Sequence, residues 1–129
     1  MSTPEATALA VLAATAADDK LAEDVIVLDV TDAIGICDVF VIASARNPRQ
    51  VKAVAEEVEE RVGATGRRPT AVEGLDTCRW VLLDYGDVVV HVFHSEERDY
   101  YRLERLYRDC ARIEWADGET GSGRSDRVV

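Results

Sequence analysis

The 129-residue sequence predicts an α/β (α+β) fold in which helices pack on a mixed sheet of about five strands. Short apolar runs rich in Val and aromatic residues are typical of buried strands, and two such runs around Asp84–Asp87 form a hairpin pattern. The order strand, helix, strand over residues 38–73 favours a parallel direction for these two strands, while the pairing order of the strands stays open. We expect a single domain over residues 1–116 and a disordered tail over residues 117–129, where Gly, Ser, Asp and Arg predominate.

The N-terminal part predicts a helix followed by two strands. Ser2–Glu5 has the hydroxyl cap and first-turn Pro of a helix start, and small apolar residues then recur at helical spacing to about Leu21. Residues 25–30 and 38–44 are largely apolar, which predicts two buried strands. The stretch 31–37 between them is a connection with one short turn at most.

A second helix is predicted to begin at Asn47-Pro48, where Asn is the cap and Pro the first helical residue. Its valines fall on one face and its Glu and Lys residues elsewhere, so the helix is amphipathic, and glycines from Gly63 onward end it. The next strand, residues 70–73, is the one expected to run parallel to residues 38–44.

The stretch WVLLDYGDVVVHVF, residues 80–93, predicts an antiparallel hairpin, because Gly86 stands where a tight turn needs positive φ. Its second arm is apolar at nearly every position, as in a central strand covered on both faces. Alternation along the first arm puts Trp80, Leu82 and Asp84 on one face. The pattern leaves open whether Trp80 is a core residue or the anchor of a partner site.

Residues from Glu96 to about Glu114 predict one helix, in which Glu104 and Arg108 are spaced to pair at i,i+4. Arginines three or four residues apart share one side of it: Arg98, Arg102, Arg105, Arg108 and Arg112. We interpret this row as a solvated face whose positive charge compensates the negative charge of the Glu-rich helix. The alternative is contact with phosphate, which predicts salt-dependent RNA binding that is lost on neutralising Arg105 and Arg108.

The formal net charge of -10 disfavours sequence-general nucleic-acid binding, because phosphate backbones repel such a chain, and it favours a basic protein partner. No stretch approaches the roughly 20 apolar residues of a membrane span, and the N-terminus lacks the pattern of a secretory signal. The three cysteines, Cys37, Cys78 and Cys110, are widely spaced, which favours a reduced, cytoplasmic protein over a disulfide framework.

No pattern in the sequence points to a catalytic, metal or cofactor site. Phosphate loops of the GxxxxGK[ST] and GxGxxG types are absent. His91 has no Cys or His neighbours at ligand spacing, so we interpret it as a hydrogen-bonded sheet histidine, with a binding-surface role as the minority alternative. Asp84 and Asp87 are interpreted as turn residues rather than as a metal or acid-base pair. Nothing local indicates that Ser44, Cys37 and His91 converge as a nucleophilic site.

Five segments together resemble the ribosomal silencing factor family, also called RsfS or Iojap. They are CDVFVIAS (Cys37–Ser44), RQVKAVAEEVEE (Arg49–Glu60), VEG (Val72–Gly74), WVLLDYGDVVVHVF (Trp80–Phe93) and RDYYRLERLYRDC (Arg98–Cys110). The hairpin run and the Arg-x-Tyr-Tyr-x-Leu-Glu-x-Leu run are the specific ones, and the resemblance extends from the first helix to Trp115. The chain departs from the family pattern at Val39, at Tyr107 and in the loop Ser44–Asn47.

The resemblance implies a non-enzyme that binds the large ribosomal subunit through its protein uL14, blocks docking of the small subunit and so represses translation. It also implies a nucleotidyltransferase-like topology without catalytic machinery or cofactor, and a monomer or a homodimer with the exposed sheet edge as a seam. The partner-binding residues that it implies are Glu73, Gly74, Trp80, Leu82, Asp84, Tyr85, His91, Arg98, Tyr101 and Glu104. The alternative hypothesis is a metal-dependent enzyme on such a scaffold that uses Asp84, Asp87 or Glu73.

Overall fold

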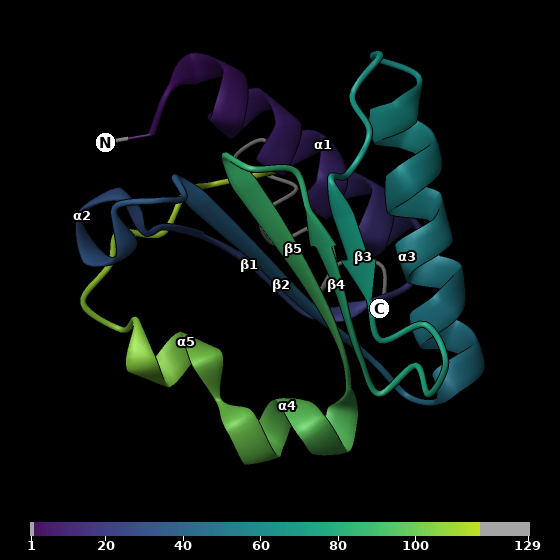
Figure 1. Cartoon of the computed structure of the whole chain (residues 1–129). Coiled ribbons are helices and arrows are strands. Elements are labelled where there is room, and N and C mark those ends of the chain that lie inside the picture. Colours follow the sequence, from purple (N-terminus) through teal and green to yellow (C-terminus); the bar gives the residue numbers. More distant parts are fainter. Residues whose placement is uncertain (1, 117–129) are drawn as a thin grey trace.

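The structure, a computed structural model, describes residues 2–116 (Figure 1). Its elements, in chain order, are α1 (Pro4–Asp19), β1 (Glu23–Asp29), α2 (Thr31–Ile34), β2 (Val39–Ala45), α3 (Pro48–Gly63), β3 (Ala71–Glu73), β4 (Trp80–Asp84), β5 (Val88–His94), α4 (Ser95–Tyr101) and α5 (Leu103–Leu106). The predicted tail over residues 117–129 lies outside the described residues. Within the described part, no helix is both long and apolar enough to cross a membrane.

The sheet has five strands in the order β1-β2-β5-β4-β3, which confirms the predicted mixed α+β architecture. Only β2 and β5 pair in parallel; the other neighbours are antiparallel. The prediction that β3 runs parallel to β2 is confirmed, and β5 and β4 lie between these two strands. The hairpin therefore takes the place beside β2, and β5 is the central strand that its continuous apolar sequence predicts.

Helices α1 and α3 cover one face of the sheet (Figure 1). The Thr3 hydroxyl accepts a hydrogen bond from the Ala6 N–H at the start of α1, and the Asn47 side chain caps α3 in the same way. The predicted apolar stripe of α3 is fully buried against β2, β4 and β5, and its members are Val51, Val54, Ala55, Val58 and Val62. This layer is the main hydrophobic core.

Helices α4 and α5 lie on the opposite face of the sheet, which carries a smaller apolar cluster (Figure 1). Ile42 and Phe93 from the two central strands are fully buried there. Leu103 and Tyr107 pack onto them from the chain that follows β5. We call this side of the sheet the Trp80 face, because Trp80 belongs to the same cluster.

The prediction of a single helix over residues 96–114 is wrong. Helix α4 ends because Arg102 adopts the left-handed conformation, with φ +49°. Helix α5 then lasts only from Leu103 to Leu106, so the arginines do not share one helical face. The predicted Glu104–Arg108 pair is also wrong, since Glu104 pairs with Arg98. The acidic helix α3 lies on the other side of the sheet from these arginines and therefore does not compensate their charge.

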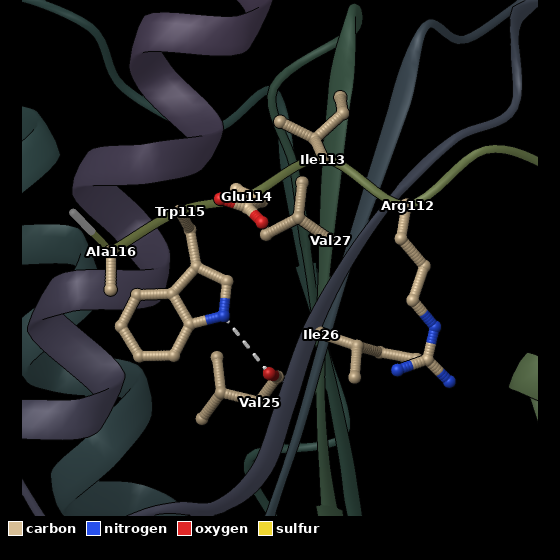
Figure 2. A pocket seen from close by; sticks show the side chains of 8 residues that line it. All are labelled: Val25, Ile26, Val27, Arg112, Ile113, Glu114, Trp115 and Ala116. Carbon is tan, nitrogen blue, oxygen red and sulfur yellow. Dashed lines mark hydrogen bonds between the residues drawn. The ribbon is translucent and has the colours of Figure 1, made fainter. Parts of the chain in front are cut away.

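Residues 111–115 run along the outer edge of β1 (Figure 2). The Ile113 N–H donates to the Val27 carbonyl at 2.9 Å, and the indole N–H of Trp115 donates to the Val25 carbonyl at 3.0 Å. These bonds use backbone groups of β1 that an incoming strand from a second chain would need. The edge of β1 is therefore covered by the chain itself.

Candidate interaction site

Trp80 opens strand β4 on the Trp80 face of the sheet. Leu82 and Asp84 project from the same face, because alternate residues of a strand point the same way. All three are partly exposed, whereas Val81 and Leu83 are fully buried toward the helices α1 and α3. The predicted alternation is confirmed. The Trp80 ring therefore packs on the core with one part and is exposed to solvent with the rest.

Four aromatic rings form a row that leads from the core to solvent, and we call it the aromatic row. The rings of Phe93 and Trp80 stack with centroids 4.7 Å apart, and the Tyr101 ring lies 4.8 Å from that of Trp80. Tyr100 meets Tyr101 edge-on at 5.0 Å. Phe93 is fully buried, whereas the side chain of Tyr100 is 78% exposed. Aromatic surface is thus held rigidly where a partner can reach it.

His91 fixes the orientation of the indole. The Nε1–H of Trp80 donates to Nδ1 of His91 at 3.1 Å, and the Phe40 ring packs edge-on against the imidazole at 4.6 Å. Burial lowers the pKa of His91 to about 4, so the ring is neutral near pH 7 and keeps its acceptor for the indole. The prediction of a hydrogen-bonded sheet histidine is confirmed. His91 is itself buried and affects the exposed surface through its hydrogen bond with Trp80.

A shallow hollow of about 250 Å³ lies beside the indole and is lined by Glu73, Gly74, Trp80 and Leu82. Gly74 is required there, because its φ is +90° and a Cβ atom would lie 2.0 Å from the Trp80 carbonyl oxygen. The close approach of these two backbones brings the exposed Glu73 carboxylate to the rim. The hollow therefore offers apolar walls with a negative charge at its edge.

Arg98 secures the corner between α4 and α5 that carries the two tyrosines. It is only 6% exposed, and its guanidinium donates to Glu104 at 3.2 Å, to the Asp24 carbonyl at 2.8 Å and to the Ser44 hydroxyl at 3.4 Å. The left-handed turn at Arg102 is what brings Glu104 back to Arg98. Arg98 and Glu104, two of the residues that the resemblance assigned to partner binding, thus pair with each other and fix this corner.

The β4–β5 turn separates two residues that sequence analysis grouped with Trp80. The Asp84 carboxylate accepts from the Gly86 N–H at 2.8 Å and stabilises the turn. Tyr85 points to the opposite side of the sheet, where it is 4% exposed and where burial raises its pKa to about 12. Tyr85 is therefore a core residue, and its expected part as an exposed aromatic anchor is corrected.

Comparison with known proteins identifies the chain. A family model described as "Ribosomal silencing factor during starvation" matches residues 3–127. The chain belongs to the ribosomal silencing factor family. By that description the family consists of regulatory proteins rather than enzymes.

Relatives of this silencing factor occur in bacteria and in chloroplasts. The chain is 46% identical over 99 residues to ribosomal silencing factor RsfS of Bacillus subtilis, which covers 77% of this chain and 84% of that protein. It is 33% identical over 110 residues to the chloroplastic protein Iojap of Zea mays, which covers 85% of this chain and 48% of that protein.

Two crystal structures have the same fold as this silencing factor. A protein of Chromobacterium violaceum is 34% identical, with a TM-score of 0.76 and coverage of 92% of this chain and 95% of that one. A protein of Bacillus halodurans is 43% identical, with a TM-score of 0.68 and coverage of 80% and 93%. The family resemblance found in the sequence is thereby confirmed.

Sequence reasoning missed three apolar side chains that the silencing factor exposes, namely Leu75, Tyr100 and Leu106. They are 42%, 78% and 73% exposed, in the loop after β3, in α4 and in α5. Tyr100 extends the aromatic row directly. Their sequence signal is weak, because a continuous helix over residues 96–114 gives no reason for tyrosine and leucine to face solvent.

Groups considered for catalysis in this silencing factor are engaged elsewhere. The Cys37 thiol donates to the Val39 and Asp87 carbonyl oxygens at 3.4 Å, and burial raises its pKa. The Ser44 hydroxyl donates to the Glu23 carbonyl. The Asp87 carboxylate pairs with Arg67 at 2.8 Å. Within residues 2–116, no group of three or more His, Cys, Asp or Glu side chains is arranged to hold a metal ion.

Proposed function

We propose that this silencing factor binds the large ribosomal subunit through its protein uL14 and, while bound, prevents the small subunit from joining. The observation that carries the proposal is the aromatic row beside the acidic-rimmed hollow at Trp80. Family membership supplies the ribosome as the partner. The cytoplasm follows as the place of action, since that is where the two subunits join.

The surface composition suits a basic protein partner. Trp and Tyr are the residues that most often dominate binding energy at protein interfaces, and here Phe93 and His91 hold the indole in place before a partner arrives. Glu73 at the rim and the net charge of -10 attract a basic ribosomal protein and orient its approach. Leu75, which follows Gly74 in the chain, and Tyr100, which extends the aromatic row, add exposed apolar surface.

The proposed mechanism is steric and breaks no bond. A bound silencing factor occupies the joining surface of the large subunit, so subunit joining falls in proportion to occupancy. The chain needs only affinity and bulk for this task. Such a role agrees with hydroxyl, thiol and carboxylate groups that are engaged in structural hydrogen bonds and ion pairs.

Subunit joining tests the proposal directly. Purified large subunits are incubated with the protein, small subunits are added under joining conditions, and the mixture is resolved on a sucrose gradient. We expect the protein to travel with the large subunit and free subunits to accumulate. Protein that stays at the top of the gradient while joining proceeds normally would overturn the proposed function.

A matched pair of variants assigns the effect to the Trp80 site. Glu73→Lys reverses a charge at the rim of the hollow, and Glu56→Lys makes the same change on the exposed side of α3, on the other face of the sheet. We expect Glu73→Lys to restore subunit joining and Glu56→Lys to inhibit joining like the wild type. Equal behaviour of the two variants would place the interface elsewhere on the molecule.

A further inference from the structure

Four exposed arginines follow the aromatic row along the chain, namely Arg102, Arg105, Arg108 and Arg112, and we call them the arginine patch. The segment that carries them crosses the Trp80 face from α4 to the edge of β1. Its apolar side chains, among them Leu103 and Tyr107, turn inward to the sheet. The arginines themselves are exposed, as are Tyr100 and Leu106 on the same stretch of chain.

The arginine patch differs from most other arginines of the described chain in its lack of carboxylate partners. Arg46, Arg61, Arg67, Arg79 and Arg98 each form an ion pair with Asp or Glu. Within residues 2–116, no ion pair involves a member of the arginine patch; the Arg102 guanidinium donates to the Asp99 carbonyl, at 2.8 Å. Four positive charges without a carboxylate partner thus lie on one short segment of a chain whose net charge is -10.

Figure 2 places the last member of the patch on the Trp80 side of the sheet. The Arg112 side chain extends beside Ile26, while Ile113 and Trp115 lie on the other side of β1. Ile26 packs with the cluster of the Trp80 face, and Ile113 and Trp115 pack with the main core. The patch and the aromatic row therefore face the same way.

Carboxylates on the same segment leave the middle of the patch free. Glu104 pairs with Arg98, and Asp99 lies within α4 and forms no ion pair in the described chain. Asp109 lines a separate hollow with Asp29 and Asp32 near α2. Arg105 and Arg108 are the members best placed to meet an anion that the partner brings.

We propose that the arginine patch binds the phosphate backbone of ribosomal RNA beside the protein contact at Trp80. The inference rests on the proposed function, which takes the large subunit as the partner. Guanidinium groups match phosphate oxygens with paired hydrogen bonds, and the surface of a ribosomal subunit offers RNA and basic protein. An acidic protein is therefore the less favoured partner. The silencing factor thus has a two-part interface, apolar and acidic toward protein and basic toward RNA.

The salt dependence of binding to purified large subunits tests this inference. Each phosphate contact contributes roughly 0.7–0.9 to the slope of log affinity against log salt. Arg105→Gln/Arg108→Gln removes two charges and should lower the slope by about 1.5 and the affinity about tenfold near 100 mM salt. Arg49→Gln/Arg68→Gln makes the same charge change at two exposed arginines, one in α3 and one in the segment after it, and should leave the slope unchanged.

Two further measurements distinguish failure of the RNA inference from failure of the proposed function. Leu82→Ala should weaken binding without changing the slope, since it removes only apolar contact in the hollow. An unchanged affinity would contradict the protein contact at Trp80 but would not bear on the RNA inference. Hydroxyl-radical probing of the ribosomal RNA should show a protected stretch that disappears with Arg105→Gln/Arg108→Gln. A slope equal to that of the wild type, or an unchanged RNA footprint despite weaker binding, would overturn the RNA inference and leave the proposed function standing.

Discussion

The indole N–H of Trp80 donates to Nδ1 of His91 at 3.1 Å, across the ladder between β4 and β5. The bond requires a neutral imidazole with its proton on Nε2, and that nitrogen is buried without a hydrogen-bond partner in the described chain. The pair therefore carries an energetic cost at Nε2 in order to fix the indole. A buried indole N–H needs an acceptor in any case, and here the acceptor also sets the orientation of the partly exposed Trp80 ring.

Truncation of Trp80 should affect both stability and binding. Because the ring is only partly buried, Trp80→Ala is expected to lower the free energy of unfolding by about 2–3 kcal/mol, below the value for a fully buried aromatic residue. Trp80→Phe keeps the stack on Phe93 and should cost about 1 kcal/mol through the lost hydrogen bond. Urea unfolding measures both. A loss from Trp80→Phe as large as that from Trp80→Ala would contradict this division.

The stability of the protein should depend on pH through His91. Its pKa is about 4 in the folded protein against 6.5 for the unperturbed group, so the unfolded state binds a proton first as the pH falls. The contribution of neutral His91 is fully present above pH 6.5 and is lost progressively toward pH 4, by up to about 3 kcal/mol. His91→Asn keeps an acceptor for the indole but cannot titrate. Unfolding curves of the wild type and His91→Asn should therefore converge or cross between pH 6.5 and 4, and parallel curves would refute the assignment.

Gly74 should tolerate substitution far less well than Gly86. Both have positive φ, +90° and +89°, but a Cβ atom on Gly74 meets the Trp80 carbonyl at 2.0 Å while one on Gly86 meets no atom within 4 Å. We expect Gly86→Ala to cost about 1–2 kcal/mol and Gly74→Ala roughly 3 kcal/mol or more, because the latter must also move the backbone of β4. Thermal unfolding provides the comparison. Equal losses would show that the two backbones separate easily.

Local patterns were sufficient to predict most of the fold. Caps at Thr3 and Asn47, the apolar stripe of α3 and Gly86 in the hairpin turn each act through neighbours in the chain, so the sequence alone indicates them. The place of β5 between β2 and β4 depends on contacts between distant segments. For that reason the sequence indicated the parallel direction of β2 and β3 but not the order of the strands between them.

The candidate site was predicted only in part for the same physical reason. Helical spacing over residues 96–114 is real, but the tertiary contacts of Arg98 with Asp24 and Ser44 favour a left-handed break at Arg102. That break brings Glu104 into a pair with Arg98, while Tyr100 in the short helix α4 is exposed to solvent. No pattern within residues 96–114 indicates that Arg98 contacts Asp24 and Ser44.

The pair Arg98–Glu104 should therefore control the shape of the α4–α5 corner. Arg98→Met removes a nearly buried cation and leaves the Asp24 carbonyl and the Glu104 carboxylate without their donor, so we expect a loss of about 3 kcal/mol. Glu104→Gln should cost less, because its side chain is partly exposed. A double-mutant cycle is expected to give a coupling of about 1–2 kcal/mol.

Binding to the large subunit then distinguishes support of the surface from direct contact. If Arg98 acts through the corner, Glu104→Gln should weaken binding without changing its salt slope, because the corner loosens while the arginine patch keeps its charge. Direct pairing of Arg98 with an anion on the partner would instead lower the slope in Arg98→Met and leave Glu104→Gln close to the wild type. Because Arg98 is 6% exposed, we expect the first pattern.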